Sequence, residues 1–206
     1  MKENKNHWYD GLFYEKIIAP NQDRIFGQIK NHIRPNSKII DIGCGTGRFS
    51  FSLNNEYKSI LGIDLSKRNI DRANLLLSKK PKVNISFQHK SVTEIISDGK
   101  DYFDYAVLTY VIHEVNEEDR IKLLKEVSQV ADKIIIGDYL VPQPNGFWKW
   151  LNEIVEFAAG NEHYRNYKNF IFNGGIQELA DKAELKILTE IRDRPLTSHL
   201  VILSSK

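Results

Sequence analysis

Short apolar segments alternate with helical patterns along the middle of this chain, and that alternation limits its possible folds more than any other feature. The segments predicted as strands are Lys38–Ile42, Ser59–Ile63, Val83–Gln88, Phe103–Thr109 and Lys133–Asp138. The helical patterns between them are Arg48–Asn54, Asn69–Ser78 and a segment opened by Asn116-Glu-Glu-Asp119, which resembles a capping box. Strands joined through helices pair in parallel. The sequence therefore predicts an α/β fold built on a mostly parallel sheet.

The N-terminal part of the chain has a helical pattern of its own. Ile25, Ile29 and Ile33 recur every four residues, and Pro35 is expected to end that helix. Because this segment precedes the first strand of the alternating region, residues 1–35 are predicted to form a helical lid.

The C-terminal part breaks the alternation. Residues 142–175 are rich in aromatic side chains and are predicted to form a mostly helical cap, inserted between the fifth strand and the last helix. Two final strands, Leu185–Ile191 and His199–Leu203, follow with only a short turn around Pro195 between them, so they must pair antiparallel. No linker or repeat divides the sequence, and residues 1–206 are predicted to form one domain.

Composition and charge are those of a soluble, enzyme-like protein. The net charge is +2, from 29 basic and 27 acidic residues spread along the chain, so no broad field favours a nucleic-acid or membrane partner. The apolar runs fall far short of the ~20 residues of a membrane span. The single cysteine, Cys44, cannot form an internal disulfide, and no apolar signal segment follows Met1. These features predict a cytoplasmic protein and are compatible with a homodimer.

The first predicted strand leads into a loop with three alternating glycines. The segment Ile39–Gly47 reads Ile-Ile-Asp-Ile-Gly-Cys-Gly-Thr-Gly, and a helix follows it. Glycine adopts positive φ and lets a ligand approach where a Cβ would collide. A dinucleotide-binding loop would have its third glycine at position 48, near the pyrophosphate, but Arg48 stands there. The loop therefore suits a nucleoside ligand that carries no phosphates.

An acid closes the second predicted strand at the position such a ligand needs. Asp64 lies 21 residues beyond Gly43, close to the ~20 at which a carboxylate accepts hydrogen bonds from both ribose hydroxyls. A glycine triplet alone would be a weak signal. Strand, triplet, helix, strand and acid in this order indicate a ligand with a nucleoside.

Three segments resemble, in order, motifs of the class I S-adenosylmethionine-dependent methyltransferases. Asp41–Gly47 resembles the first motif, Gly62–Asp64 the second and Phe103–Val115 the fourth, within a similar region of roughly residues 36–140. The resemblance implies a Rossmann-like, seven-stranded, mostly parallel sheet. Its last strand would be antiparallel, and helices would cover both faces.

The resemblance also implies S-adenosylmethionine as the cofactor. The loop glycines would pass under its methionine part, Asp41 would approach its amino group, and Asp64 would hold the ribose with Leu65 against one adenine face. The predicted cofactor-binding residues are Asp41, Gly43, Cys44, Gly45, Gly47, Asp64, Leu65, Ser91, Val92 and Thr109. Cys44 has a packing role in this set, because the loop needs a small side chain there and no histidine is evident to activate a thiol.

Two positions depart from familiar patterns. Where the family commonly has an acid that binds the adenine amino group, the resemblance implies that Ser91 would offer a weaker hydroxyl contact and that Val92 would pack on the ring. After the fourth strand, Thr109-Tyr110 replaces the Asp/Asn-Pro-Pro-Tyr/Phe sequence. This replacement speaks against methylation of nucleobase amino groups.

Methyl transfer from a sulfonium is an in-line displacement, so the protein mainly aligns the acceptor and excludes water. A base is needed only if the acceptor loses a proton. His113 and His163 are the two catalytic candidates, with loop packing and a solvated helix as their structural alternatives. Asp138 is placed to serve as one metal ligand, but Thr109 and Tyr110 supply no carboxylate partner, so no metal site is predicted.

The aromatic residues are candidates for acceptor binding, because rigid rings offer apolar area at low entropic cost and attract cations. The predicted substrate-binding residues are Tyr110, Trp148, Tyr164 and Tyr167. Ordinary core packing is the alternative for each of them.

The leading hypothesis is methyl transfer to an O-, N- or C-nucleophile of a small molecule. One alternative is an NAD-dependent oxidoreductase, which Asp64 permits but Arg48 and the antiparallel final strand disfavour. The other is a regulatory module that binds S-adenosylmethionine without catalysis, for which Ser91 is the one hint.

Overall fold

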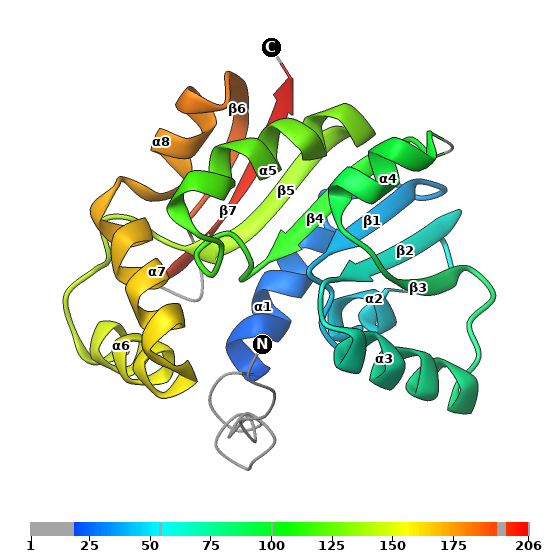
Figure 1. Ribbon diagram of the computed structural model, residues 1–206, viewed down its shortest axis with the longest axis horizontal. Helices are drawn as coiled ribbons and strands as arrows, with labels where there is room; N and C mark the ends of the chain where they lie inside the picture. Colours follow the sequence, from blue (N-terminus) through cyan, green and yellow to red (C-terminus); the bar gives the residue numbers. More distant parts are fainter. Residues whose placement is uncertain (1–18, 54, 100, 193–196, 206) are drawn as a thin grey trace.

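The computed structural model describes residues 19–53, 55–99, 101–192 and 197–205 as a single sheet covered by helices (Figure 1). The strands are β1 (Lys38–Ile42), β2 (Ser59–Asp64), β3 (Ile85–His89), β4 (Phe103–Thr109), β5 (Ala131–Tyr139), β6 (Leu185–Ile191) and β7 (Ser198–Ser205). The helices are α1 (Ala19–Lys30), α2 (Arg48–Ser52), α3 (Lys67–Lys79), α4 (Val92–Asp98), α5 (Glu117–Val130), α6 (Phe147–Ala159), α7 (Asn161–Phe172) and α8 (Gly175–Lys182).

The sheet has the order β3-β2-β1-β4-β5-β7-β6. The strands from β3 to β5 pair in parallel, whereas β7 is antiparallel to both of its neighbours. The predicted fold, a seven-stranded Rossmann-like sheet with an antiparallel last strand, is confirmed. Strand order reverses at β1, because β2 and β3 lie on one side of it in the sheet and β4 and β5 on the other. Ligands of such open sheets bind at the carboxyl ends of the strands beside this switch point.

Helices cover both faces of the sheet, as predicted. Successive side chains of a strand point to opposite faces. Ile40 and Leu108 accordingly pack in a core with α4, α5, α7 and α8, while Ile39 and Val107 pack in a second core with α1, α2 and α3. In the described part of the chain, no helix has the combined length and apolar character that a bilayer crossing requires.

The predicted lid and cap are partly visible. Residues 1–18 of the predicted lid lie outside the described residues, and α1 represents the remainder. This helix ends at Lys30 rather than at Pro35, because turns replace the helical pattern over Asn31–Ile33. Residues 142–175 form α6 and α7, the mostly helical structure predicted for the insertion, and these two helices lie side by side at one end of the molecule (Figure 1).

Some local predictions need correction. Helix α4 was not predicted, although Ser91 and Glu94 form a complete capping box at its start. The box expected at Asn116 is absent, because that side chain makes no capping hydrogen bond and instead accepts one from Asn166 Nδ2 at 3.2 Å. Asn54 and the turn around Pro195 lie outside the described residues.

Candidate active site

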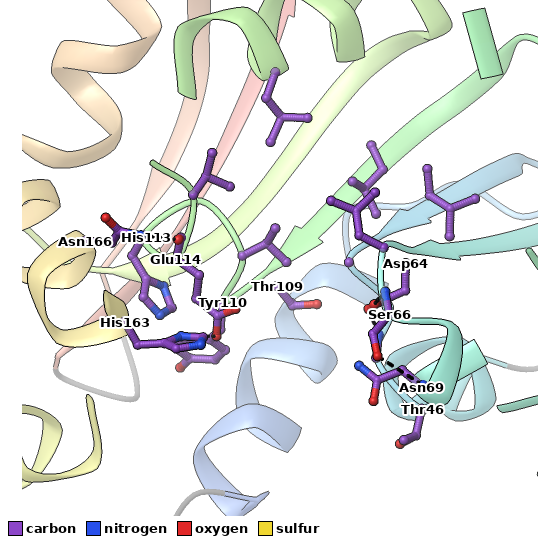
Figure 2. A pocket seen from close by; sticks show the side chains of 18 of the residues that line it. Thr46, Asp64, Ser66, Asn69, Thr109, Tyr110, His113, Glu114, His163 and Asn166 are labelled. Carbon is purple, nitrogen blue, oxygen red and sulfur yellow. Dashed lines mark hydrogen bonds and ion pairs between the residues drawn. The ribbon is translucent and has the colours of Figure 1, made fainter. Parts of the chain in front are cut away.

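A cavity of about 1840 Å³ opens at the carboxyl ends of the central strands. Its walls come from the loops after β1, β2, β3 and β4 and from helices α3, α5, α6 and α7. Figure 2 shows Thr46, Asp64, Ser66 and Asn69 at one end and a second group with His113 and His163 at the other. We call the end at Asp64 the nucleoside end and the end at His113 the acceptor end. The cavity exceeds the roughly 300–1,000 Å³ of a typical small-ligand site, so it has room for a cofactor and a second molecule.

The three loop glycines all have positive φ but serve different purposes. A Cβ on Gly47 would lie 2.5 Å from Cζ of Phe87, and one on Gly43 would lie 2.6 Å from Cγ2 of Val111. A Cβ on Gly45 would meet no atom within 4 Å. Gly43 and Gly47 therefore allow close packing within the protein, whereas the space above Gly45 is part of the cavity.

Asp64 fixes the shape of the nucleoside end. Its carboxylate accepts a hydrogen bond from Gly45 N–H at 2.8 Å and another from Ser66 N–H at 2.7 Å. Ser66 is also the N-cap of α3, where its hydroxyl accepts from Asn69 N–H. One side chain thus joins the glycine loop to the start of α3, and its remaining lone pairs are available to a ligand.

Asp41 lies beneath the loop, fully buried and away from the cavity wall. Its Oδ2 accepts a hydrogen bond from the Ser50 hydroxyl at 2.6 Å, while Oδ1 has no partner among the described residues. Burial raises the pKa of this carboxyl to about 7, against the lowering effect of the Ser50 hydrogen bonds. The oxygen predicted to bind an amino group therefore lies behind the glycine loop and not on the cavity wall.

Other predicted cofactor-binding residues are divided between the cavity wall and the protein interior. Leu65, 76% exposed, lines the cavity together with Ser91, Val92 and Thr109. The hydroxyl of Ser91 is already engaged, because it donates to Glu94 Oε2 at 2.8 Å and accepts from Glu94 N–H. Cys44 is buried off the wall, and burial raises the pKa of its thiol. Cys44 therefore packs beneath the loop.

His113 is enclosed by carboxylates at the acceptor end. Its Nδ1–H donates to Asp138 Oδ1 at 2.7 Å, and its Nε2 lies 3.5 Å from Glu156 Oε1. Glu156 also accepts from the Tyr139 hydroxyl at 2.7 Å. Burial lowers the pKa of His113, but the charges of Asp138 and Glu156 outweigh it and hold that pKa well above its usual 6.5.

His163 lies across the acceptor end, on α7, and is more open (Figure 2). Its side chain is 39% exposed, and its Nδ1 lies 3.9 Å from Glu114 Oε1. One turn further along α7, Asn166 donates to the main-chain oxygen of Glu114 at 2.8 Å. Helix α7 is thereby attached to the loop that carries His113 and Glu114.

The buried Arg120 strengthens that attachment. It donates to the main-chain oxygens of His113, Val115 and Asn166 and to Asn169 Oδ1. Its guanidinium also lies over the Phe170 ring, 5.5 Å from the ring centroid. One side chain of α5 therefore joins the loop after β4 to α7.

Of the four aromatic residues predicted to bind the acceptor, only Tyr110 lines the cavity. Its hydroxyl donates to Ser198 Oγ at 2.9 Å. Trp148 projects from α6 and is half exposed beside Phe147, whereas Tyr164 packs against Phe157 and Tyr167 is buried against Tyr139. The helical period directs these three rings toward solvent or the core.

Sequence reasoning missed several residues of the acceptor end. Glu156, Tyr139, Asn166 and Arg120 meet there through tertiary packing, and no local motif announces them. Asp138 was considered only as a metal ligand, yet it accepts hydrogen bonds from the His113 ring and from the Ile112 and His113 amides.

Comparison with known proteins agrees with this geometry. Residues 39–133 match the family model described as a methyltransferase domain. The ubiquinone biosynthesis O-methyltransferase of Pelagibacter ubique is 36% identical over 98 residues, which cover 48% of this chain and 39% of that protein. An uncharacterized RNA methyltransferase of Mycoplasma mobile is 28% identical over 142 residues, 68% of this chain and 38% of that protein. The chain thus spans about two fifths of the length of these relatives.

A solved structure shares the fold over the whole chain. The magnesium protoporphyrin IX methyltransferase of Synechocystis PCC 6803, solved with bound SAH, superimposes with a TM-score of 0.66 at 14% identity, covering 100% of this chain and 90% of that one. Sheet order, glycine loop and strand-end acid define an α/β domain that binds a nucleoside. With the match of residues 39–133 to a methyltransferase domain, they make this region of the chain similar to the class I S-adenosylmethionine-dependent methyltransferases.

Proposed function

We propose that this protein transfers a methyl group from S-adenosylmethionine to a small molecule held at the acceptor end of the cavity. The observation that carries the proposal is the open space above Gly45, whose N–H is held by the acid that ends β2. A ligand with a nucleoside and an amino-acid tail suits this space, because the tail can cross the loop where no Cβ stands.

The nucleoside end suits the cofactor residue by residue. Asp64 has carboxylate lone pairs for ribose hydroxyls, and Leu65 gives an exposed apolar surface for the adenine. Val92 lines the same end. When bound, the cofactor supplies a methyl group activated on a sulfonium. The protein binds this cofactor, aligns the acceptor with it and keeps water away.

The charge of the acceptor end favours a small uncharged molecule over a nucleic acid. Glu114, Glu156 and Glu162 line it. The lysines and arginines that line the cavity belong to other elements: Arg68 and Arg72 to α3, Lys90 to the loop after β3 and Lys122 to α5. Phosphate backbones are bound mainly by Lys and Arg. We therefore propose a small-molecule acceptor, as the name of the Pelagibacter relative also suggests.

Three broader expectations belong to this proposal. Residues 1–206 would act as one domain, with α1 as part of a lid and α6–α7 as a cap over the acceptor. The protein would work in the cytoplasm, where a lone buried cysteine needs no partner. The protein would act as a monomer or as a homodimer.

Calorimetric titration with S-adenosylhomocysteine tests the proposal, with NADH as the competing ligand. We expect S-adenosylhomocysteine to bind with one site per chain and NADH to give no heat. Tight NADH binding would favour the oxidoreductase. Cofactor binding without methyl transfer to any member of a broad acceptor panel, together with a stable protein complex, would favour the regulatory module.

A further inference from the structure

The two histidines of the acceptor end are in different chemical states, and only one has a ring nitrogen free for an acceptor. His113 has both nitrogens directed at buried carboxylates, Nδ1 at Asp138 and Nε2 at Glu156. Its side chain is 2% exposed, and the ring of Tyr139 packs against it, 4.8 Å away between centroids. A ring held this way is an imidazolium with no lone pair to receive a proton.

His163 is placed differently. Its Nδ1 has no accessible surface and no hydrogen-bond partner among the described residues, yet 39% of the side chain is exposed and the residue lines the cavity. The accessible part of the ring is therefore the part away from Nδ1, which includes Nε2. Glu114 Oε1, 3.9 Å from Nδ1, is the nearby carboxylate that can orient the ring once Nδ1 carries the proton.

The position of Glu114 opposite His163 is built into the fold. Asn166 lies three residues after His163, on the same face of α7, and its side chain donates to the Glu114 main-chain oxygen at 2.8 Å. Arg120 holds the same two segments from the other side through the oxygens of His113 and Asn166. These hydrogen bonds fix the position of α7 relative to the loop after β4.

We propose that His163, oriented by Glu114, accepts the proton of a hydroxyl acceptor, and that His113 is a fixed cation that joins the sheet to the cap. The inference rests on the proposed function. In the step, the acceptor O–H bond breaks and its proton binds Nε2 of His163. An oxygen electron pair forms the bond to the methyl carbon, while the methyl–sulfur bond breaks and leaves its pair on sulfur. Glu114 stabilises the resulting imidazolium.

This assignment limits the acceptor class. An imidazole has a pKa near 6.5, so it deprotonates a phenolic or enolic hydroxyl far more readily than an alkyl alcohol. A neutral amine attacks with its own lone pair and requires no base. The acceptor is therefore expected to present an acidic hydroxyl.

Histidine ring NMR on the full chain tests the assignment without a known acceptor. We expect both ring nitrogens of His113 to remain protonated from about pH 6 to 8. Glu114→Gln should reduce the fraction of His163 rings that carry the proton on Nδ1, because the carboxylate 3.9 Å from that nitrogen is lost. Glu153→Gln is the matched control, because Glu153 pairs with Lys168 at 3.1 Å on the same pair of cap helices.

Reaction with diethyl pyrocarbonate, which acylates neutral accessible imidazoles, gives a second measurement. Peptide mass spectrometry should find His163 modified and His113 unmodified near pH 6.5. Titration of His113 in the neutral range, or a His163 tautomer unaffected by Glu114→Gln, would overturn the assignment.

Labelled methyl transfer to a panel of phenols and alkyl amines tests the acceptor class. Methylation of amines alone would overturn the hydroxyl acceptor. His163→Asn should keep its affinity for S-adenosylhomocysteine. Failure of the unmodified protein to bind S-adenosylhomocysteine would refute the proposed function. Binding of S-adenosylhomocysteine together with the opposite behaviour of the two histidines would refute only this inference.

Discussion

Replacing Asp64 by asparagine should weaken cofactor binding more than it weakens the fold. The carboxylate accepts from Gly45 N–H and Ser66 N–H, at 2.8 and 2.7 Å. Asparagine has one side-chain oxygen, so its NH2 group must face one of these N–H donors, and the ribose hydroxyls lose a charged acceptor. Hydrogen bonds to a charged group contribute about 1.5 to 3 kcal/mol. We therefore expect the Kd for S-adenosylhomocysteine to rise by roughly 10- to 150-fold.

Calorimetric titration measures this change, and thermal unfolding of the ligand-free protein controls for damage to the fold. Loss of one backbone hydrogen bond should lower the Tm by only about 2–4 °C in a chain of this size. Asp181→Asn is the matched control, because it removes the same charge from an exposed position of α8 outside the cavity. Unchanged affinity in Asp64→Asn, or an equal loss in Asp181→Asn, would refute the assignment of Asp64.

Four further substitutions test the glycine loop, the buried Asp41 carboxyl and the Arg120 contacts. Gly45→Ala should abolish binding of S-adenosylhomocysteine in calorimetry and lower the free energy of unfolding by only about 1 kcal/mol. Gly47→Ala should lower the free energy of unfolding by about 1–3 kcal/mol, because its Cβ would lie 2.5 Å from Phe87. Equal midpoints of urea unfolding for the two variants would contradict this contrast. The pKa of Asp41 is raised from 3.8 to about 7, so its stabilising contribution is complete below pH 3.8 and is lost as the pH rises through 7. Asp41→Asn should therefore gain stability relative to the original chain on the order of 4 kcal/mol between about pH 4 and 8 in urea unfolding, and a constant difference would refute it. Arg120→Lys should lower the free energy of unfolding by about 2–4 kcal/mol, because an ammonium cannot span the four acceptors. Amide hydrogen exchange should also increase in α7. Unchanged exchange would show that Arg120 does not hold that helix.

The nucleoside end could be predicted from sequence because its parts are local. A strand, a glycine loop and the next strand-end acid lie within Lys38–Asp64, and parallel pairing of β1 with β2 brings them together. The same local reading would have found α4, since Ser91 and Glu94 have the spacing of a capping box.

The acceptor end could not be predicted in the same way. His113, Asp138 and Glu156 come from three elements, and only the packing of α6 on the sheet decides that they meet. The aromatic-rich cap was recognised by composition, but composition does not fix which side of a helix faces the cavity. Trp148, Tyr164 and Tyr167 consequently lie away from the wall, while Glu156 lines it.

A crystal structure of the complex with S-adenosylhomocysteine is the most direct measurement of the central claim. The account predicts ribose oxygens against the Asp64 carboxylate, the amino-acid tail across Gly45 and the sulfur directed toward the end that holds His163. Density for the ligand elsewhere, or a tail that avoids the glycine loop, would contradict it.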